Sequence, residues 1–315
     1  MNNLPRPFFA LAPMDDVTDT VFRQVIADCA KPDLYFTEFV NVDGLQSPGR
    51  AKLLHKLQFV AKEQPIFAQI WGLKPENFHK TASDLASMGF AGIDINMGCP
   101  VKTVIKDGAC AALMNNRELA SAIIKSTKKG AGKLPVSIKT RLGFSDFDPS
   151  WHEFLLGHNL AMLTIHGRNK KQVSKVPADW QAIGQIRELR DKLAPQTLIV
   201  GNGDVMSRAQ GEQLADQHRL DGIMIGRGVF YDPFVFAKNS TWENYSKAQK
   251  LQLYKKHVEL FAKTYQNNER RIVTLNKFCK IYVNGFDGAK ELREQLMGAG
   301  STNEISRILE AFNAD

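Results

Sequence analysis

The sequence predicts a closed (β/α)8 barrel, a TIM barrel, followed by a small all-helical domain at the carboxyl end. Short apolar runs alternate with longer segments of helical periodicity, which is the pattern of strand–helix units around a parallel sheet. Eight such runs can be counted, the number that closes a barrel. After Asp232-Pro233 the alternation stops, and from about Tyr245 the chain becomes polar and helical.

Each expected strand is a short apolar run bounded by polar residues, glycine or proline. In chain order these runs are Phe8–Ala12, Leu34–Thr37, Ile66–Ile70, Gly92–Asn96, Val136–Thr140, Met162–His166, Thr197–Gly201 and Gly222–Gly226. Helical periodicity predicts helices near Thr18–Ala30, Pro75–Met88, Arg117–Lys129, Pro149–Asn159, Trp180–Lys192 and Ser207–Gln217. The second connection has no clear helix. We expect residues 1–240 to form the barrel and residues 241–315 the helical domain.

Composition places the chain among ordinary globular proteins. Its 315 residues are 43% hydrophobic and 23% charged, which fits one barrel of about 250 residues with an appendage. No apolar stretch approaches the roughly 20 residues of a membrane span, and the start lacks the apolar region of a signal peptide. The four cysteines have no zinc-site or redox-pair spacing. We therefore expect a cytoplasmic protein without a membrane, metal or obligate protein partner.

The net charge of +8 is concentrated near the carboxyl end. Residues 247–280 contain nine basic residues and only two acidic residues, Glu259 and Glu269. They are Lys247, Lys250, Lys255, Lys256, Lys263, Arg270, Arg271, Lys277 and Lys280. Such a surface could meet nucleic-acid phosphates, although a run of charge alone is more often a solvated helix face.

Cys99 is the strongest candidate for chemistry. The alternation of Asp94–Asn96 breaks at Gly98 and at a Cys99-Pro100 bend, which places the thiol in a loop at the carboxyl end of a strand. A free cysteine is often inert packing, but a loop position favours exposure. An ordinary thiol with a pKa of about 8.5 is mostly protonated at neutral pH. That state suits a proton donor, although a nucleophile remains open.

Two further strand ends carry cations. Lys139 and Arg141 are two residues apart, so both side chains leave the same face of an extended chain. A lysine there forms a Schiff base or holds a negative charge. His166 and Arg168 have the same spacing around Gly167, and an arginine fork suits a phosphate. Barrel chemistry gathers at the carboxyl ends of the strands, so these residues predict an anionic or electron-rich ligand.

The last two strands end in glycine-rich turns, where barrels frequently bind phosphate. The residues of these turns are Asn202, Gly203, Asp204, Gly226 and Arg227. After the first strand, Pro13 and Met14 would present a turn and a soft side chain to a flat ring. Gln69 offers an amide that can donate to and accept from a pyrimidine-like edge.

These residues, in this order, resemble the bacterial, FMN-dependent tRNA-dihydrouridine synthases, flavoenzymes that reduce chosen uridines in tRNA. The similarity spans the barrel and includes Asp94–Pro100 and Ser137–Gly143. Its most specific part combines the Asn-x-Gly-Cys-Pro motif of the first segment with the Lys-x-Arg motif of the second. The other similar segments are Ala12–Met14, Thr37–Val40, Gln69, Val101–Leu113, His166–Arg168, Ala178–Trp180, Asn202–Asp204 and Gly226–Arg227.

The resemblance implies a set of residues and a reaction. It implies FMN bound by Pro13, Met14, Gln69, Lys139, His166, Arg168, Asn202, Gly203, Asp204, Gly226 and Arg227. Hydride would pass from flavin N5 to uracil C6 while Cys99 protonates C5, and NADPH would reduce the flavin again. Asn96 and Arg141 would face the flipped-out uracil, and the helical domain, with Arg270, Arg271 and Lys277, would help to bind tRNA.

Some positions depart from the family pattern. Asn169 replaces the usual threonine, and the segment 170–177 lacks the usual tyrosine and glycine, so the modified uridine stays open. Cys110 stands where alanine or glycine is common, and we expect it to pack, with redox sensitivity an open alternative. NADPH preference over NADH and the oligomeric state are also open.

Three other functions compete with this interpretation. A Lys139 Schiff-base aldolase on a sugar phosphate would leave Cys99, Gln69 and the basic segment unexplained. A flavin enzyme acting on a free pyrimidine would not need the basic helical domain. A tRNA-binding barrel without catalysis would not need an intact Cys99 and Lys139.

Overall fold

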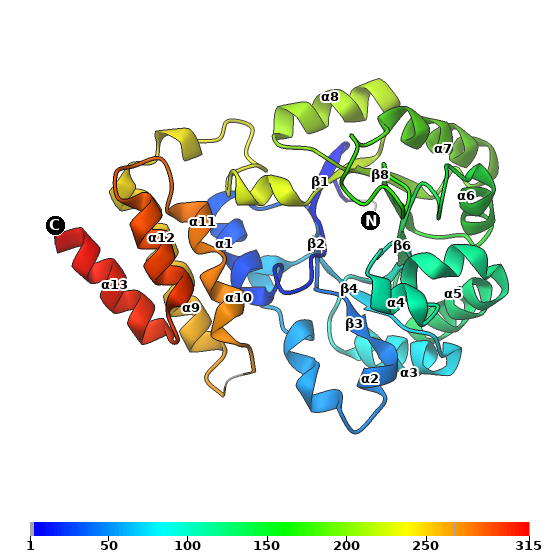
Figure 1. Ribbon diagram of the computed structural model, residues 1–315. Coiled ribbons are helices and arrows are strands. Elements are labelled where there is room, and N and C mark those ends of the chain that lie inside the picture. The colour runs from blue at the N-terminus through cyan, green and yellow to red at the C-terminus, as the bar shows by residue number, and fades with distance from the viewer. Residues whose placement is uncertain (1–2, 268, 315) are drawn as a thin grey trace.

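The structure, a computed structural model, describes residues 3–267 and 269–314 and is a parallel barrel with a helical domain at its side (Figure 1). Eight strands are hydrogen-bonded in the order β1-β9-β8-β7-β6-β5-β4-β2. A parallel bridge between Ala10 and Leu34 joins the two ends of this order and closes the barrel. The (β/α)8 fold class is confirmed.

The strands follow the expected runs with small shifts at their ends. They are β1 (Phe8–Leu11), β2 (Tyr35–Phe36), β3 (Val40–Asn41), β4 (Ile66–Trp71), β5 (Gly92–Asn96), β6 (Val136–Arg141), β7 (Met162–His166), β8 (Leu198–Asn202) and β9 (Gly222–Ile225). The second strand has two residues instead of four. The unexpected β3 extends the same side of the barrel by pairing Val40 with Ile70 of β4.

Helices cover the outside of the barrel and form the carboxyl-terminal part. The barrel helices are α1 (Thr20–Ala30), α2 (Val42–Leu45), α3 (Pro75–Ser87), α4 (Lys102–Lys106), α5 (Arg117–Ala131), α6 (Pro149–Leu156), α7 (Trp180–Leu193) and α8 (Arg208–His218). The later helices are α9 (Lys247–Thr264), α10 (Ile272–Asn276), α11 (Cys279–Tyr282), α12 (Ala289–Gly298) and α13 (Thr302–Ala314). The second connection holds only α2 and three 3-10 turns, as expected.

Helix starts are set by side-chain caps. Asp148 caps α6, which has proline in its first turn, and Asp179 caps α7. Ser207 and Ser246 cap α8 and α9 in the same way. Each cap satisfies a backbone N–H that has no partner within the helix.

The inside of the barrel has an apolar lower layer and a polar upper layer. Alternate residues of each strand point inward, and the lower layer packs as one buried cluster. It contains Phe8, Phe36, Phe67, Met162, Val200 and Met224. Two positions further along three of these strands lie Gln69, Asn202 and Gly226. The strand period therefore brings the polar candidates together above an apolar floor.

The helical domain packs against α1. The Phe22 ring of α1 lies 4.7 Å from that of Phe278 and 5.7 Å from that of His257, measured between centroids. In Figure 1 the helices α9 to α13 lie on the α1 side of the barrel. The boundary between residues 240 and 241 stays a prediction. Among residues 3–267 and 269–314, no helix is long and apolar enough to cross a membrane.

Candidate active site

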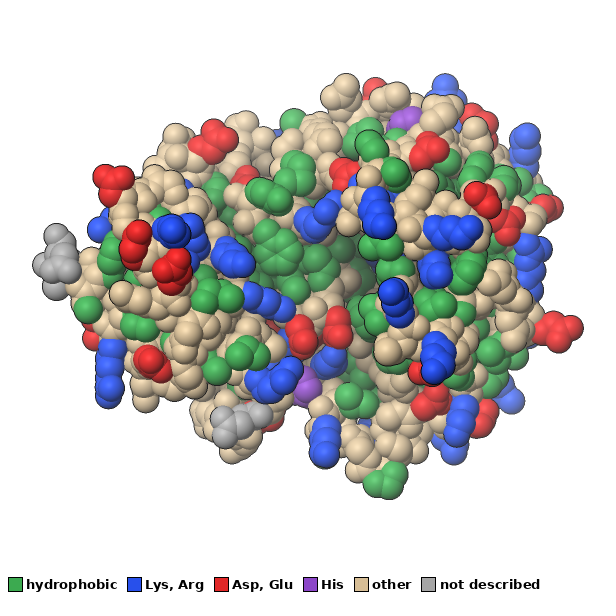
Figure 2. All heavy atoms as spheres, in the orientation of Figure 1, with side chains coloured by type: hydrophobic (Ala, Val, Ile, Leu, Met, Phe, Trp, Pro, Cys, Tyr) green, Lys and Arg blue, Asp and Glu red, His purple; other side chains and the backbone are tan. Residues whose placement is uncertain are grey.

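The fourteen barrel residues expected at the site all line one cavity of about 330 Å³ at the carboxyl ends of the strands. This volume lies within the range of ligand pockets. They are Pro13, Met14, Gln69, Asn96, Cys99, Lys139, Arg141, His166, Arg168, Asn202, Gly203, Asp204, Gly226 and Arg227. Figure 2 shows a hollow in this face, with hydrophobic side chains inside it and lysine and arginine side chains around it.

A chain of hydrogen bonds runs across the cavity floor from β6 to β4. The Ser137 hydroxyl donates to one carboxylate oxygen of Asp94. The Gln69 amide nitrogen donates to the other oxygen at 2.6 Å. Burial raises the pKa of Asp94 to about 6, although the bonds from Ser137 and Gln69 favour its charged form. Asp94 fixes which end of the Gln69 amide is the donor.

The same chain continues to the thiol loop. The Asn96 amide nitrogen donates to the Gln69 side-chain oxygen at 3.0 Å. The Asn96 side-chain oxygen is therefore free to accept from the backbone N–H groups of Gly98 and Cys99, at 3.1 and 3.0 Å. The orientation of two amides thus determines how the Cys99 loop is held.

The Cys99 thiol is half-buried and is more acidic than expected. A hydrogen bond from the Cys110 thiol lowers the pKa of Cys99 to about 7, and the Val101 backbone and the Arg141 charge add to this effect against burial. The sequence had indicated an ordinary, mostly protonated thiol, so this expectation is corrected. The thiol form, which a proton donor requires, is present below about pH 7 and is lost above it.

Cys110 packs in the core, as expected, but it also contacts the site. Its side chain is buried and its backbone has a positive φ of 53°. The contact with Cys99, together with burial, raises the pKa of Cys110 well above its usual value. Cys110 therefore stays a thiol and serves as a hydrogen-bond donor to Cys99.

Lys139 and Arg141 bring positive charge into the cavity. The Lys139 ammonium donates to Asn202 Oδ1 at 3.1 Å. Burial and the nearby Arg141 charge lower the pKa of Lys139 to about 8, so it is mostly cationic at neutral pH. Arg141 Nε donates to the Gly98 carbonyl at 2.7 Å, which ties β6 to the thiol loop.

His166 is neutral in this environment. Burial, followed by the charges of Lys139, Arg141 and Arg168, depresses the pKa of His166 far below its usual value. Its Nε2 lies 3.1 Å from Arg168 Nη1, so it accepts there. The other ring nitrogen carries the proton.

Asp204 holds both arginines of the expected phosphate site. One carboxylate oxygen pairs with Arg168, and the other lies 2.7 Å from Arg227 Nη2. Burial raises the pKa of Asp204, but these bonds outweigh it and the pKa is lowered. The Arg168 side chain is 3% exposed, whereas that of Arg227 is 57% exposed. Arg227 is therefore the arginine with donors available at the cavity mouth.

Gly203 is required by its surroundings. Its φ is 135°, and a Cβ atom there would lie 2.6 Å from that of Ala178 and 3.4 Å from the His166 ring. A larger residue would close this side of the cavity.

The three basic residues expected at the RNA surface have different surroundings. Arg271 is exposed and Lys277 is half-buried. Arg270 is buried, with its guanidinium paired to Glu38, Asp19 and Asp16. The expected contact of Arg270 with RNA is corrected, because its donors face carboxylates inside the protein.

The sequence analysis gave no role to Asp94, Ser137 and Phe39, although all three lie in segments similar to the family. Asp94 precedes Asn96 by two residues, so the strand period already placed it on the inward face. Ser137 has the same relation to Lys139. Phe39 lines the cavity from the loop after β2, and the family resemblance covered it within Thr37–Val40 without giving it a role.

Fold and site together define a (β/α)8-barrel enzyme whose cavity combines a half-buried thiol with buried cations. The family model described as "Dihydrouridine synthase (Dus)" matches residues 10–314. The chain belongs to the dihydrouridine synthase family.

Close relatives extend over the whole chain. A "Probable tRNA-dihydrouridine synthase" of Staphylococcus aureus (strain COL) is 46% identical over 99% of this chain and 95% of the relative. A "Probable tRNA-dihydrouridine synthase 2" of Bacillus subtilis (strain 168) is 46% identical over 98% of this chain and 95% of the relative.

Solved structures share the barrel. Morphinone reductase superimposes with a TM-score of 0.52 at 12% identity, over 74% of this chain and 85% of that one. A 2-naphthoyl-CoA reductase gives a TM-score of 0.57 at 12% identity, over 76% of this chain and 50% of that one. At these identities the likeness concerns the fold alone.

Proposed function

We propose that this protein reduces the C5–C6 double bond of specific uridines in tRNA to 5,6-dihydrouridine, with FMN as its cofactor and NADPH as the reductant. Membership of the dihydrouridine synthase family supports the reaction class. The observation that carries the proposal is the single cavity that joins Cys99 to Lys139, Gln69 and the Asp204 arginines. A proton donor, a cation and a phosphate-type site are thereby within reach of one ligand.

The cavity fits a flat, electron-rich ligand with a phosphate group. An ammonium has three donors, and within the described residues the hydrogen bond of Lys139 is to Asn202 alone. Its remaining donors can meet an anionic ring. Gln69 uses one donor and one acceptor on Asp94 and Asn96, which leaves one of each for a pyrimidine-type edge. Arg227 and the Gly203 and Gly226 turns suit the phosphate.

FMN, when bound there, supplies the hydride for C6 of the uracil. Pro13 and Met14 would pack against its flat ring, and Lys139 would stabilise negative charge on that ring. The polar rim of the cavity would bind the cofactor through four side chains: the neutral imidazole of His166 together with Arg168, Asn202 and Asp204. The positions of these side chains around one cavity support these roles.

Cys99 donates the proton to C5 of the uracil. C5 gains basicity as hydride reaches C6, because the C5–C6 bond is conjugated to a carbonyl. With a pKa of about 7 the thiol is acidic enough to give up a proton readily at neutral pH. Asn96 and Arg141, which flank Cys99, orient the base.

The uridine must leave its stack to reach this depth. The rest of the tRNA then lies across the face shown in Figure 2, where basic side chains lie on both sides of the hollow and acidic side chains lie below it. We place Arg271 and Lys277 on this surface, from the helical domain, and we exclude Arg270 because it is buried.

The proposal is tested first by the visible absorption spectrum of the purified protein. Release of the chromophore and its mass identify the cofactor, and released FMN would support the proposal. A colourless protein that takes up no added FMN would refute it and favour the Lys139 aldolase. Flavin bleaching with NADPH and with NADH then compares the two reductants.

A further inference from the structure

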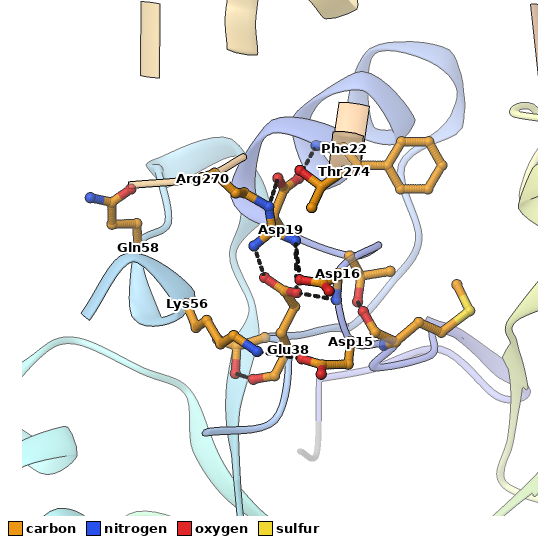
Figure 3. A network of polar contacts seen from close by, with 12 residues as sticks. Asp15, Asp16, Asp19, Phe22, Glu38, Lys56, Gln58, Arg270 and Thr274 are labelled. Carbon is orange, nitrogen blue, oxygen red and sulfur yellow. Dashed lines mark hydrogen bonds and ion pairs between the residues drawn. The ribbon is translucent and has the colours of Figure 1, made fainter. Parts of the chain in front are cut away.

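Arg270 reaches from the segment between α9 and α10 to the loops that follow β1 and β2 (Figure 3). Its Nη1 and Nη2 lie 2.7 and 3.0 Å from the two carboxylate oxygens of Glu38. Its Nε lies 3.1 Å from the Asp19 carboxylate, and Nη2 lies 3.4 Å from that of Asp16. We call these four residues the Arg270 cluster. The Arg270 and Glu38 side chains are 3% and 0% exposed, so each charge depends on the other.

Two carboxylates of the cluster belong to loops that form one wall of the cavity. Glu38 directly precedes Phe39, and Asp16 follows Met14 by two residues; Phe39 and Met14 both line the cavity. The loops also contact each other, because the Asp16 backbone N–H donates to Glu38 Oε1 at 2.6 Å. Arg270 therefore binds both loops at once.

A second path leads from Glu38 to the cavity floor. The Thr37 hydroxyl donates to the Glu38 carbonyl at 2.7 Å and accepts from the Gln69 backbone N–H at 3.0 Å. Gln69 in turn fixes the Asn96 amide that holds the thiol loop. A displacement of Glu38 would thus reach the residues that face the ligand.

The helical domain meets the start of α1 at the same place. Asp19 accepts from the Phe22 backbone N–H as the cap of α1, and the Tyr265 hydroxyl donates to its second oxygen at 3.2 Å. In the part of the chain that the structure describes, Arg270 is the cation paired with Asp16, Asp19 and Glu38. A buried ion pair adds little net stability, so stability alone does not account for this arrangement.

We propose that Arg270 is a positioning residue that couples the helical domain to the shape of the active-site cavity. Through Glu38 and Asp16 it holds the loops that present Phe39 and Met14. Its effect on catalysis rests on the proposed function, since it acts through a cavity that binds flavin and uracil. Coupling of this kind is reciprocal, so flavin binding also strengthens the contact between the two parts of the chain.

The test compares Arg270→Gln with Arg271→Gln. The two residues are adjacent and lose the same charge, but Arg271 is exposed and lies outside the cluster. Arg270→Lys keeps the charge without the two-pronged contact, and the double variant Arg270→Gln/Glu38→Gln removes both buried charges. Thermal melting confirms that each variant is folded, and Arg270→Lys serves if Arg270→Gln is not.

Two sets of measurements are made on the full chain, one on the loops and one on the site. Hydrogen exchange of residues 13–18 and 37–40 reports the loops without any cofactor. The FMN dissociation constant, the visible circular dichroism of bound flavin, and kcat and KM report the site. We expect faster loop exchange, an altered flavin spectrum and a kcat lower by about tenfold to a hundredfold in Arg270→Gln, with partial recovery in the double variant. Arg271→Gln should change the KM for tRNA and leave the flavin spectrum unchanged.

The outcomes separate the two proposals. If the wild-type protein binds FMN and Arg270→Gln matches Arg271→Gln in loop exchange, flavin spectrum and kcat, Arg270 does not position the cavity. If the wild-type protein binds no FMN, the proposed function fails, and loop exchange alone decides the role of Arg270. In that case too, equal loop exchange in Arg270→Gln and Arg271→Gln would overturn the positioning role of Arg270.

Discussion

The contact between Cys110 and Cys99 leads to a defined pH dependence. With a pKa of about 7 for Cys99, the protonated fraction falls from about nine-tenths at pH 6 to about one-tenth at pH 8. A step in which Cys99 is the acid therefore slows about tenfold over this interval. Reduction of the substrate should be fast below pH 7 and slow above it.

Substitution of Cys110 should move this transition. In Cys110→Ala the hydrogen bond that stabilises the Cys99 thiolate is lost, so the pKa of Cys99 rises toward that of an ordinary thiol. At pH 8 Cys99 is then mostly protonated, and the variant should be faster than the wild type by a factor that approaches about tenfold. At pH 6 the two should be equally fast.

The assay is a single turnover of pre-reduced enzyme with tRNA that lacks dihydrouridine, followed from pH 6 to pH 9. Cys110→Ser is the matched control, because its hydroxyl can still donate to Cys99 and should keep the transition near pH 7. Cys99→Ala should retain its flavin and be slow at every pH. A transition at the same pH in Cys110→Ala and Cys110→Ser, or a rate that rises with pH, would refute the reasoning.

Three further predictions concern the ligand-binding residues. Lys139→Met should weaken FMN binding by about tenfold or more. Binding of FMN to the wild type should weaken as pH rises through about 8, where Lys139 loses its charge. Fluorescence titration measures both affinities, and an unchanged affinity would contradict this role of Lys139. In Asp94→Asn the new amide can donate as well as accept, so the Gln69 amide loses its fixed orientation. The variant should retain FMN, and its kcat should fall about tenfold. A kcat equal to that of the wild type would show that the chain of amides does not affect catalysis. Reversing the charge of Arg271 and Lys277 should weaken tRNA binding and reduce its dependence on salt, whereas indifference of the affinity in filter binding would place the RNA elsewhere.

The sequence predicted the barrel and most of its cavity for one physical reason. Strands alternate with period two, and parallel strands end at the same face. Residues such as Lys139 and Asn202 could therefore be assigned to one site from their place at the ends of apolar runs. All fourteen expected barrel residues lie around one cavity.

What the sequence could not predict depends on contacts that the strand and helix periods do not determine. Arg270 and Arg271 are neighbours with the same side chain, and only the docking of the helical domain on Glu38, 232 residues away, buries one and exposes the other. The acidity of Cys99 depends on Cys110, which follows α4 in the chain and contacts the thiol only once this segment has folded back. Such contacts leave no periodic signal in the chain.

The central claim is reduction of uridine in tRNA with Cys99 as the acid. The most direct test incubates the FMN-loaded protein and NADPH with tRNA that carries its other modifications but lacks dihydrouridine, and analyses the nucleosides by mass. We predict uridines that gain two hydrogens with the wild-type protein and almost none with Cys99→Ala, which should remain yellow. No dihydrouridine from the flavin-loaded wild type, or equal amounts from the two proteins, would contradict the account.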